Sequence, residues 1–337
     1  MRELFTKIFD QVLAGFRRCD AAGVPLDQRN VEFRFEQADL STHRGRRDVE
    51  PVGGSADGPA TDRFEKIDDV KKVVFVGSPA TGVRIAEAAA KRVLPCVLEL
   101  GGKSANIIFA DADLKRAALT AQAAIFAGAG QSCVAGSRLL VQRSIYDEFI
   151  GMIATGAKKI KVGAPLDDAT EVGPINNRTQ YDHIMKMIAS GVQAGATLVA
   201  GSAERSSGGY FVSPTVLSNV TNEMDVARTE IFGPVVAAIP FDTEEEALNI
   251  ANDTEFGLAG AVWTNDVGRA HRVAGQVNAG TFWVNGYKTI NVASPFGGYG
   301  LSGYGRSSGV EALYEYTQTK SVWVETAREP ATTFGYL

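Results

Sequence analysis

Cysteine and histidine are scarce in this chain, and their scarcity excludes several kinds of site. The 337 residues include 3 cysteines and 3 histidines. No Cys-x-x-Cys pair and no His-Glu-x-x-His pattern occurs, so the sequence predicts neither a disulfide framework nor a bound metal. Free cysteines at this density are typical of a reducing compartment, and we expect a cytoplasmic protein.

Long apolar runs and an excess of positive charge are also missing. No apolar stretch reaches the roughly 18 residues that a membrane-spanning helix needs, and the first residues do not follow the order of a signal peptide. The formal net charge is −5, from 34 basic and 39 acidic side chains. Because nucleic acids and anionic membranes attract basic surfaces, we expect neither as a partner.

The sequence is rich in short, patterned apolar runs. Hydrophobic residues make up 45% and charged residues 22%, which is typical of a packed protein. A length of 337 residues predicts two domains at about 150 residues each. Residues 4–16 carry a helical apolar stripe, which fits a core-facing helix, a transit peptide or a membrane-lying helix. Residues 36–62 are polar and rich in arginine, glycine and proline, which predicts a linker or irregular loop.

From residue 71 onward, β-branched runs alternate with helical patterns. This alternation predicts an α/β fold with parallel strands joined by helices. The expected strands cover residues 73–76, 96–100, 106–109, 138–141, the neighbourhood of 198, 235–239, 259–263, 280–284 and 321–325. The expected helices cover residues 83–92, 114–126, 145–159, 180–194, 244–252 and 268–277.

A glycine-bounded turn, Gly77-Ser78-Pro79-Ala80-Thr81-Gly82, follows the first expected strand. Ser78 suits the N-cap of the next helix and Pro79 its first turn, so backbone N–H groups would face outward at the positive end of the helix dipole. Such a terminus binds phosphate groups. Because the pattern is shorter than a full dinucleotide fingerprint, an ordinary strand-to-helix turn is the alternative.

Cys133 is a candidate nucleophile. It lies among small residues in Gly128-Ala129-Gly130-Gln131-Ser132-Cys133-Val134-Ala135-Gly136. Small neighbours leave room for a substrate and expose backbone N–H groups that hold an oxyanion. A plain packing role is the alternative. Cys96, inside an apolar strand, and Cys19, in a stretch of unclear fold, are expected to be inert.

Glu99 is a candidate base. It stands in Leu98-Glu99-Leu100-Gly101-Gly102, at the carboxyl end of an expected strand, where α/β sheets place their sites. Desolvation by apolar neighbours raises the pKa of a carboxyl group and makes it a base near neutral pH. A structural salt bridge is the alternative.

Two further motifs match known fingerprints without the required context. Gly298-Tyr299-Gly300-Leu301-Ser302-Gly303 has G-x-G-x-x-G spacing but no strand leading into it, so we expect a flexible turn. Gly305-Arg306-Ser307-Ser308-Gly309 has G-x-S-x-G spacing. An α/β-hydrolase needs a histidine after that serine, and the last histidine is His271, so this interpretation fails.

Four segments together resemble the signatures of the aldehyde dehydrogenase superfamily. They are Leu98-Glu99-Leu100-Gly101-Gly102-Lys103-Ser104, Gly130-Gln131-Ser132-Cys133, Glu230-Ile231-Phe232-Gly233-Pro234-Val235 and Ser294-Pro295-Phe296-Gly297-Gly298. Cys133 follows Glu99 by 34 residues, which is the order and spacing of that family. The resemblance extends from about residue 70 to residue 326.

The resemblance implies a fold and an activity. The fold would combine an incomplete Rossmann-like dinucleotide-binding domain with an α/β catalytic domain and a C-terminal oligomerisation strand. The implied boundaries are 1–50 for a segment outside the family, 51–101 for the partial dinucleotide-binding domain, 102–295 for the catalytic domain and 296–337 for the return segment and oligomerisation strand. The activity would be oxidation of an aldehyde to a carboxylic acid through a Cys133 thiohemiacetal and thioester, with Glu99 activating the hydrolytic water. The resemblance also implies NAD or NADP as cofactor and a homo-oligomer, either a dimer or a tetramer.

The same resemblance assigns roles to further residues. Cofactor contacts fall on Gly77, Ser78, Gly82, Leu100, Glu230 and Phe232, and the aldehyde tunnel on Phe296, Trp283 and Tyr287. Taken without the resemblance, Glu230 is predicted to be a surface carboxylate, and the aromatic residues are predicted to be core residues.

The N-terminal part departs from the family pattern. Members carry, before the glutamate, a Trp-Asn motif that completes the oxyanion hole and a Lys-Pro segment that holds the adenosine ribose; neither occurs here. We therefore expect a chain truncated or replaced at its N-terminus. Loss of one oxyanion donor typically lowers the rate by about 10²–10³. A non-enzymatic scaffold or subunit partner, and a cofactor-independent esterase, are the alternatives to a dehydrogenase.

Overall fold

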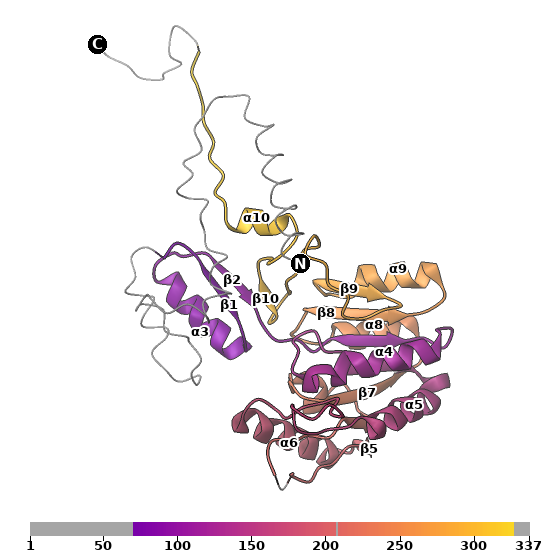
Figure 1. The fold of residues 1–337 in the computed structure, drawn as a ribbon. Coiled ribbons are helices and arrows are strands. Elements are labelled where there is room, and N and C mark those ends of the chain that lie inside the picture. Colours follow the sequence, from indigo (N-terminus) through magenta and orange to yellow (C-terminus); the bar gives the residue numbers. More distant parts are fainter. Residues whose placement is uncertain (1–69, 207, 327–337) are drawn as a thin grey trace, which may run out of the picture. The chain divides into compact units, whose positions relative to one another are not determined.

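The computed structural model describes residues 70–206 and 208–326, which form two β-sheets with helices around them (Figure 1). Every described residue belongs to one unit of the chain, which lies within residues 55–337. The strands are β1 (Val73–Val76), β2 (Cys96–Glu99), β3 (Ala105–Ile108), β4 (Arg138–Gln142), β5 (Thr197–Ala200), β6 (Thr215–Ser218), β7 (Val235–Phe241), β8 (Ala259–Trp263), β9 (Thr281–Val284) and β10 (Gly303–Tyr304). The α-helices are α3 (Pro79–Ala90), α4 (Leu114–Phe126), α5 (Tyr146–Lys159), α6 (Arg178–Gln193), α7 (Asp225–Arg228), α8 (Glu244–Asn252), α9 (Val267–Gln276) and α10 (Glu311–Glu315), with 3-10 turns η3 (Ala127–Gly130) and η4 (Arg143–Ile145).

The smaller sheet has the strand order β1-β2-β10. β1 pairs with β2 in parallel, and β10 pairs with β2 in the antiparallel direction, opposite its last residue, Glu99. Helix α3 begins where Ser78 caps it and proline fits its first turn. Its Ile85 packs with Leu98 and Leu100 in a small core. Strand β10 and helix α3 therefore both contact the end of β2 and fix its position.

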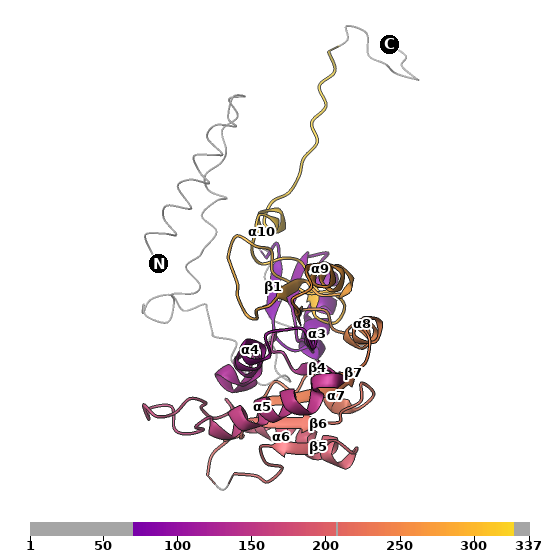
Figure 2. The same cartoon turned by 90° about the vertical axis from the view of Figure 1, so that its right-hand side faces the viewer.

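The larger sheet has the strand order β5-β6-β7-β4-β3-β8-β9, parallel except where β5 pairs with β6. Successive β3 residues Ile107 and Ile108 belong to different hydrophobic clusters. Helices α6, α8 and α9 contribute to one cluster and α4 and α5 to the other, so helices cover both faces (Figures 1 and 2). This double burial explains the continuous apolar runs of the central strands.

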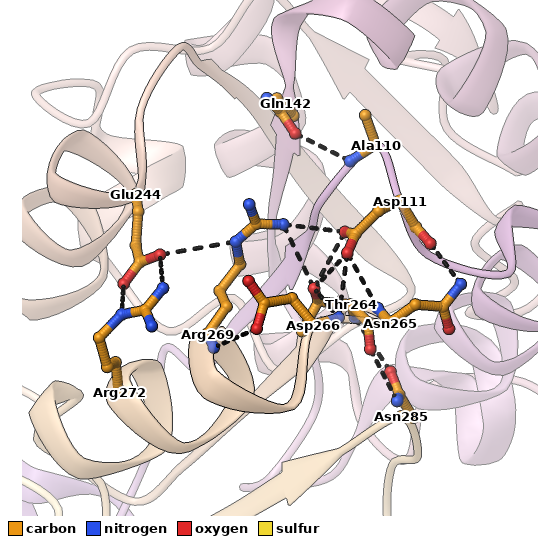
Figure 3. A network of polar contacts seen from close by, with 10 residues as sticks. All are labelled: Ala110, Asp111, Gln142, Glu244, Thr264, Asn265, Asp266, Arg269, Arg272 and Asn285. Carbon is orange, nitrogen blue, oxygen red and sulfur yellow. Dashed lines mark hydrogen bonds and ion pairs between the residues drawn. The ribbon is translucent and has the colours of Figure 1, made fainter.

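A polar network centred on Asp111 joins β3, β8 and α9 at one end of the larger sheet (Figure 3). The Asp111 carboxylate accepts hydrogen bonds from the Thr264 hydroxyl at 2.8 Å and from the backbone N–H of Asp266 at 3.1 Å, and it pairs with Arg269 at 2.9 Å. Asp266 in turn caps α9. One carboxylate therefore fixes the β8–α9 connection onto β3.

The predicted α/β architecture is confirmed. The strands at 73–76 and 259–263 and the helices at 114–126 and 244–252 have the predicted bounds. The sequence reasoning missed β6, a short strand that begins and ends with a hydroxyl residue, and β10, whose two residues pair with β2 far back in the chain. Neither has the apolar alternation that marks a strand.

In the single chain, residues 321–325 pair with no described strand, and Val322 is 72% and Trp323 93% exposed. The strand that the resemblance assigns to pairing between subunits stays a prediction. Another expectation for the C-terminal part is wrong. The turn Gly298–Gly303 is not a flexible loop: the fully buried Ser302 donates to the carbonyl of Gly101 at 2.6 Å and accepts from the N–H of Gly257 at 3.1 Å. Because both partners lie far away in the sequence, local pattern did not reveal this role.

The expected N-terminal helix at 4–16 and the loop at 36–62 lie outside the described residues. Within the part that the structure describes, no helix is long and apolar enough to cross a membrane.

Replacing Asp111 by alanine should destabilise the protein, because the buried Thr264 hydroxyl and the Arg269 guanidinium would lose their acceptor. We expect Asp111→Ala to lower the free energy of unfolding by about 1–3 kcal/mol in urea denaturation. Asp168→Ala, on an exposed loop, is the matched control and should leave stability unchanged. Equal stability of the two variants would contradict the role given to this network.

Candidate active site

Glu99 ends β2 and is 7% exposed. Its backbone carbonyl accepts a hydrogen bond from Gly77 at 3.1 Å, and its Oε1 atom has no hydrogen-bond partner in the structure. Burial raises the pKa of the Glu99 carboxyl group, against the lowering effects of a hydrogen bond from Ser307 and the charge of Arg306. A desolvated carboxylate with a free oxygen is suited to accept a proton.

Cys133 lies between η3 and β4, on a loop that glycine makes compact. Gly130 has a φ of 67°, and a Cβ atom there would lie 2.1 Å from the carbonyl oxygen of Gly233. Only glycine tolerates both the left-handed backbone and this approach. The loop is therefore packed directly against the segment that carries Glu230.

The thiol of Cys133 faces two carboxylates. Burial raises its pKa, the charges of Glu230 and Glu99 raise it further, and backbone N–H groups of Val134 and Cys133 lower it. The structure thus brings together Cys133, Glu99 and Glu230, which are up to 131 residues apart in the sequence. Negative charge around the sulfur favours the neutral thiol, and the backbone donors favour the thiolate.

The glycine pair after Glu99 allows these loops to meet. Gly102 donates its N–H to Glu230 Oε1 at 3.1 Å. A Cβ atom on Gly101 would lie 2.0 Å from Glu230 Oε2, and one on Gly102 would lie 2.4 Å from the carbonyl oxygen of Cys133. Side chains larger than hydrogen would therefore separate the carboxylate and the thiol loop.

Glu230 is half-buried. Burial raises the pKa of its carboxyl group, and the Gly102 hydrogen bond and the charge of Lys103 lower it. Phe232, with a φ of 50°, has its carbonyl bound by Gln180 at 3.1 Å. Both residues line a hollow of about 10 Å³ that Ser132 also borders. The predicted cofactor residues Glu230 and Phe232 therefore adjoin the thiol loop.

The turn from Gly77 to Gly82 has an exposed and a packed part. Gly77 and Ser78 are exposed at the N-terminus of α3, where Ser78 accepts from the N–H of Thr81 at 3.4 Å. Gly82 is buried, and a Cβ atom there would lie 2.6 Å from a methyl group of Leu100. The exposed helix terminus is open to a phosphate, whereas Gly82 keeps α3 close to the end of β2.

The three predicted tunnel residues gather beside the thiol. Trp283 and Tyr287 stack with ring centroids 4.7 Å apart, and Tyr287 would be 3.2 Å from a Cβ atom on Gly136. Cys133 and Phe296 pack against the cluster that contains both rings. The aromatic residues therefore border the sulfur.

Sequence reasoning missed two buried basic side chains behind the site. Arg138 is 1% exposed and donates to the carbonyls of Lys103 at 2.9 Å, Ile250 at 2.7 Å and Ala251 at 2.8 Å. Burial lowers its pKa to about 10. Lys103 is also 1% exposed, its Nζ atom has no hydrogen-bond partner, and burial together with the Arg138 charge lowers its pKa to about 7. The signal for Lys103 was its place directly after the glycine pair.

Sequence reasoning also missed Ser307 and Arg306, although both lower the pKa of the Glu99 carboxyl group. They lie in the G-x-S-x-G segment, which was excluded as the nucleophile turn of a hydrolase because no histidine follows it. In the part of the chain that the structure describes, no three His, Cys, Asp or Glu side chains group as a metal site.

These features define an α/β protein in which glycine-packed loops bring a cysteine thiol together with the buried carboxylate of Glu99 and the half-buried carboxylate of Glu230. The chain belongs to the aldehyde dehydrogenase family, whose model matches residues 55–322. The family predicted from the four signatures is thereby confirmed.

Relatives and solved structures agree with this assignment. The chain is 46% identical over 257 residues to human retinal dehydrogenase 2, covering 76% of this chain and 50% of that protein. It is 44% identical over 258 residues to betaine aldehyde dehydrogenase of Brucella anthropi, covering 75% and 53%. The NAD⁺ complex of aldehyde dehydrogenase from Bacillus cereus superposes with a TM-score of 0.75 at 44% identity, covering 77% of this chain and 53% of that one. The chain thus spans about half the length of the relatives it matches.

Lys103 should make stability depend on pH in a definite direction. Its pKa is about 7 in the folded protein and 10.5 in an exposed lysine, so the unfolded state binds more protons between these pH values. The free energy of unfolding therefore rises with pH across this window, by up to about 1.4 kcal/mol per pH unit from this group.

Lys103→Met removes this contribution. Denaturation curves from pH 7 to pH 10 should show a smaller slope of stability against pH for the variant than for the wild type. Parallel pH dependences would contradict the buried, uncharged lysine.

Proposed function

We propose that this chain oxidises an aldehyde to a carboxylic acid with Cys133 as nucleophile and Glu99 as base. The observation that carries the proposal is the close packing of three segments at Gly101 and Gly102, which brings Cys133, Glu99 and Glu230 to one place. Perturbed titratable groups that converge beside a nucleophile are typical of active sites. The chemistry of the named relatives supports the aldehyde as substrate.

In the first step, the Cys133 thiol gives its proton to solvent and the thiolate Sγ forms a bond to the aldehyde carbon. The carbonyl π bond breaks, and its electron pair makes the oxygen the oxyanion of a thiohemiacetal. The backbone N–H groups of Cys133 and Val134 face the sulfur and lower the pKa of the thiol. The same donors would stabilise charge on the adjacent oxygen. Trp283, Tyr287 and Phe296 border the sulfur and would hold the substrate's apolar part.

In the second half of the reaction, water attacks the thioester carbon, the C–S bond breaks and the acid leaves. Glu99 accepts the proton of this water. Its raised pKa makes the carboxylate a stronger base than an exposed glutamate, and the unpartnered Oε1 atom is free to receive the proton.

The described residues fit a nicotinamide dinucleotide. The exposed terminus of α3, with Gly77 and Ser78, suits the pyrophosphate, and Gly82 and Leu100 fix the position of that helix. Glu230 and Phe232 would hold the nicotinamide end, since they adjoin the thiol loop. When bound, NAD or NADP supplies the hydride acceptor between the two half-reactions.

The organisation of the whole protein is part of the same proposal. We place a dinucleotide-binding part at 51–101, a catalytic part at 102–295 and a return segment at 296–337, because the two sheets are connected between β2 and β3 and β10 returns to β2. The exposed Val322, Trp323 and Val324 support a homo-oligomer that covers them. The cytoplasmic location remains a prediction from cysteine content.

Cys133→Ala should abolish aldehyde-dependent reduction of NAD or NADP, because no other described thiol lies at the site. We expect a decrease in kcat of about 10³-fold or more, measured by absorbance at the wavelength of the reduced cofactor. Cys96→Ala, at the start of β2, is the matched control and should keep full activity. Activity that survives in Cys133→Ala would exclude this nucleophile, and a wild-type chain inactive with every aldehyde would favour a scaffold.

Glu99→Gln should slow release of the acid more than formation of the thioester. We expect an initial burst of reduced cofactor followed by turnover about 10²-fold or more below the wild type. In the wild type, kcat should fall on acidification around a pKa above 4.5, because only the carboxylate accepts the proton, and this limb should vanish in the variant. A variant with unchanged steady-state turnover would remove Glu99 from the mechanism.

A further inference from the structure

Lys288 stands on a short segment that is fixed at both ends. The side chain of Asn285 accepts from the N–H of Thr264 at 3.0 Å and donates to the carbonyl of Thr264 at 2.9 Å. At the other end, Trp283 Nε1 donates to the carbonyl of Thr289 at 2.9 Å. Between these anchors Lys288 has a φ of 59°, a left-handed conformation that lysine rarely adopts. Such an outlier persists only where the surrounding structure imposes it, and it often marks a functional position.

The segment lies directly beside the thiol. Tyr287, the residue before Lys288, is buried, stacks on Trp283 and belongs to the cluster against which Cys133 packs. Lys288 itself is half-buried, and its charge interacts with Cys133. Burial lowers the pKa of Lys288, and the charge of the thiolate raises it. Lys288 is therefore a half-buried lysine on a segment that packs against the same cluster as Cys133.

No carboxylate neutralises this ammonium group within residues 70–206 and 208–326, where Lys288 takes part in no ion pair. The charged groups that act on the Cys133 thiol, Glu230 and Glu99, are both negative. Glu230 is bound to the Gly102 N–H, and Glu99 interacts with Arg306 and Ser307. A half-buried cation without a counter-ion beside a nucleophile is a recognition group for an anion.

We propose that Lys288 selects aldehydes that carry an anionic group, a carboxylate or a phosphate, a few bonds from the carbonyl carbon. This inference rests on the proposed function, since it assigns a substrate class to the same thiol. The ammonium group attracts the distal anion while Sγ attacks the carbonyl carbon, and the charge on Lys288 offsets the repulsion by Glu99 and Glu230. Neutral aldehydes lack this interaction and should bind more weakly.

Matched substrates test the charge preference. We would compare 4-oxobutanoate with butanal, and glyceraldehyde 3-phosphate with glyceraldehyde, which separates a carboxylate from a phosphate preference. Lys288→Met should lower kcat/KM about tenfold or more for the preferred anionic aldehyde, mainly through KM, and change the neutral partner by less than about threefold. Lys288→Arg should keep the preference, and Lys158→Met, an exposed lysine on α5, should match the wild type. Equal losses for both members of each pair would overturn the proposal.

A second measurement needs neither cofactor nor turnover. Iodoacetate and iodoacetamide alkylate thiolates and differ in charge, so the ratio of their rates at Cys133, followed by mass spectrometry of the peptide, reports the local charge. A change in the thiol pKa alters both rates equally and leaves the ratio unchanged. Lys288→Met should lower the iodoacetate-to-iodoacetamide ratio several-fold, and added salt should lower it in the wild type.

The two experiments separate the inference from the proposed function. A chain that oxidises no aldehyde but keeps the Lys288-dependent alkylation ratio would contradict the dehydrogenase and retain the anion site. A ratio that Lys288→Met leaves unchanged would overturn the anion site even in an active dehydrogenase. Lys288→Asn, which tolerates the left-handed backbone better, repeats both tests should Lys288→Met fold poorly.

Discussion

The guanidinium of Arg138 connects the loop that carries Cys133 with the segment that follows Glu99. It begins β4, five residues after Cys133, and donates to the carbonyl of Lys103, four residues after Glu99. Its other nitrogens bind the last carbonyls of α8, at Ile250 and Ala251, which lack partners within the helix. A buried arginine is costly unless it is hydrogen-bonded, and here three backbone carbonyls and Asn222 accept hydrogen bonds that involve each of its three nitrogens, without a carboxylate. The relative position of thiol and base therefore depends on one desolvated cation.

The same desolvation determines the electrostatics in front of Arg138. Burial raises the pKa of Cys133, Glu99 and Glu230 alike, because desolvation penalises the charged form of each group. The negative charges of Glu230 and Glu99 raise the pKa of the thiol further. Backbone N–H groups at Cys133 and Val134 act in the opposite direction and lower the pKa of the thiol.

The parts of this arrangement that are local in sequence were predictable, and those that depend on distant pairing were not. Cys133 among small residues and Glu99 at a strand end both carry their signal within a few positions, and most helices and strands follow from periodicity. Ser302 has no such signal, because its partners Gly101 and Gly257 come from two other parts of the chain. Lys288 was overlooked for a similar reason: its left-handed backbone and its closeness to the sulfur arise from anchors at Thr264 and Trp283, not from its neighbours.

Glycine explains why the local signals sufficed to find the site at all. The thiol loop, the strand end at Glu99 and the Glu230 segment are far apart in the sequence. In the fold they contact one another at glycines, where a Cβ atom would overlap the neighbouring segment. At Gly102 that partner is the carbonyl of Cys133, and at Gly101 it is the carboxylate of Glu230. A glycine that flanks a reactive residue in a sequence motif therefore indicates a tertiary contact, because another loop occupies the space that a side chain would fill. A preference for charged substrates leaves no comparable pattern of glycines in the sequence. It can therefore be inferred only from the folded structure.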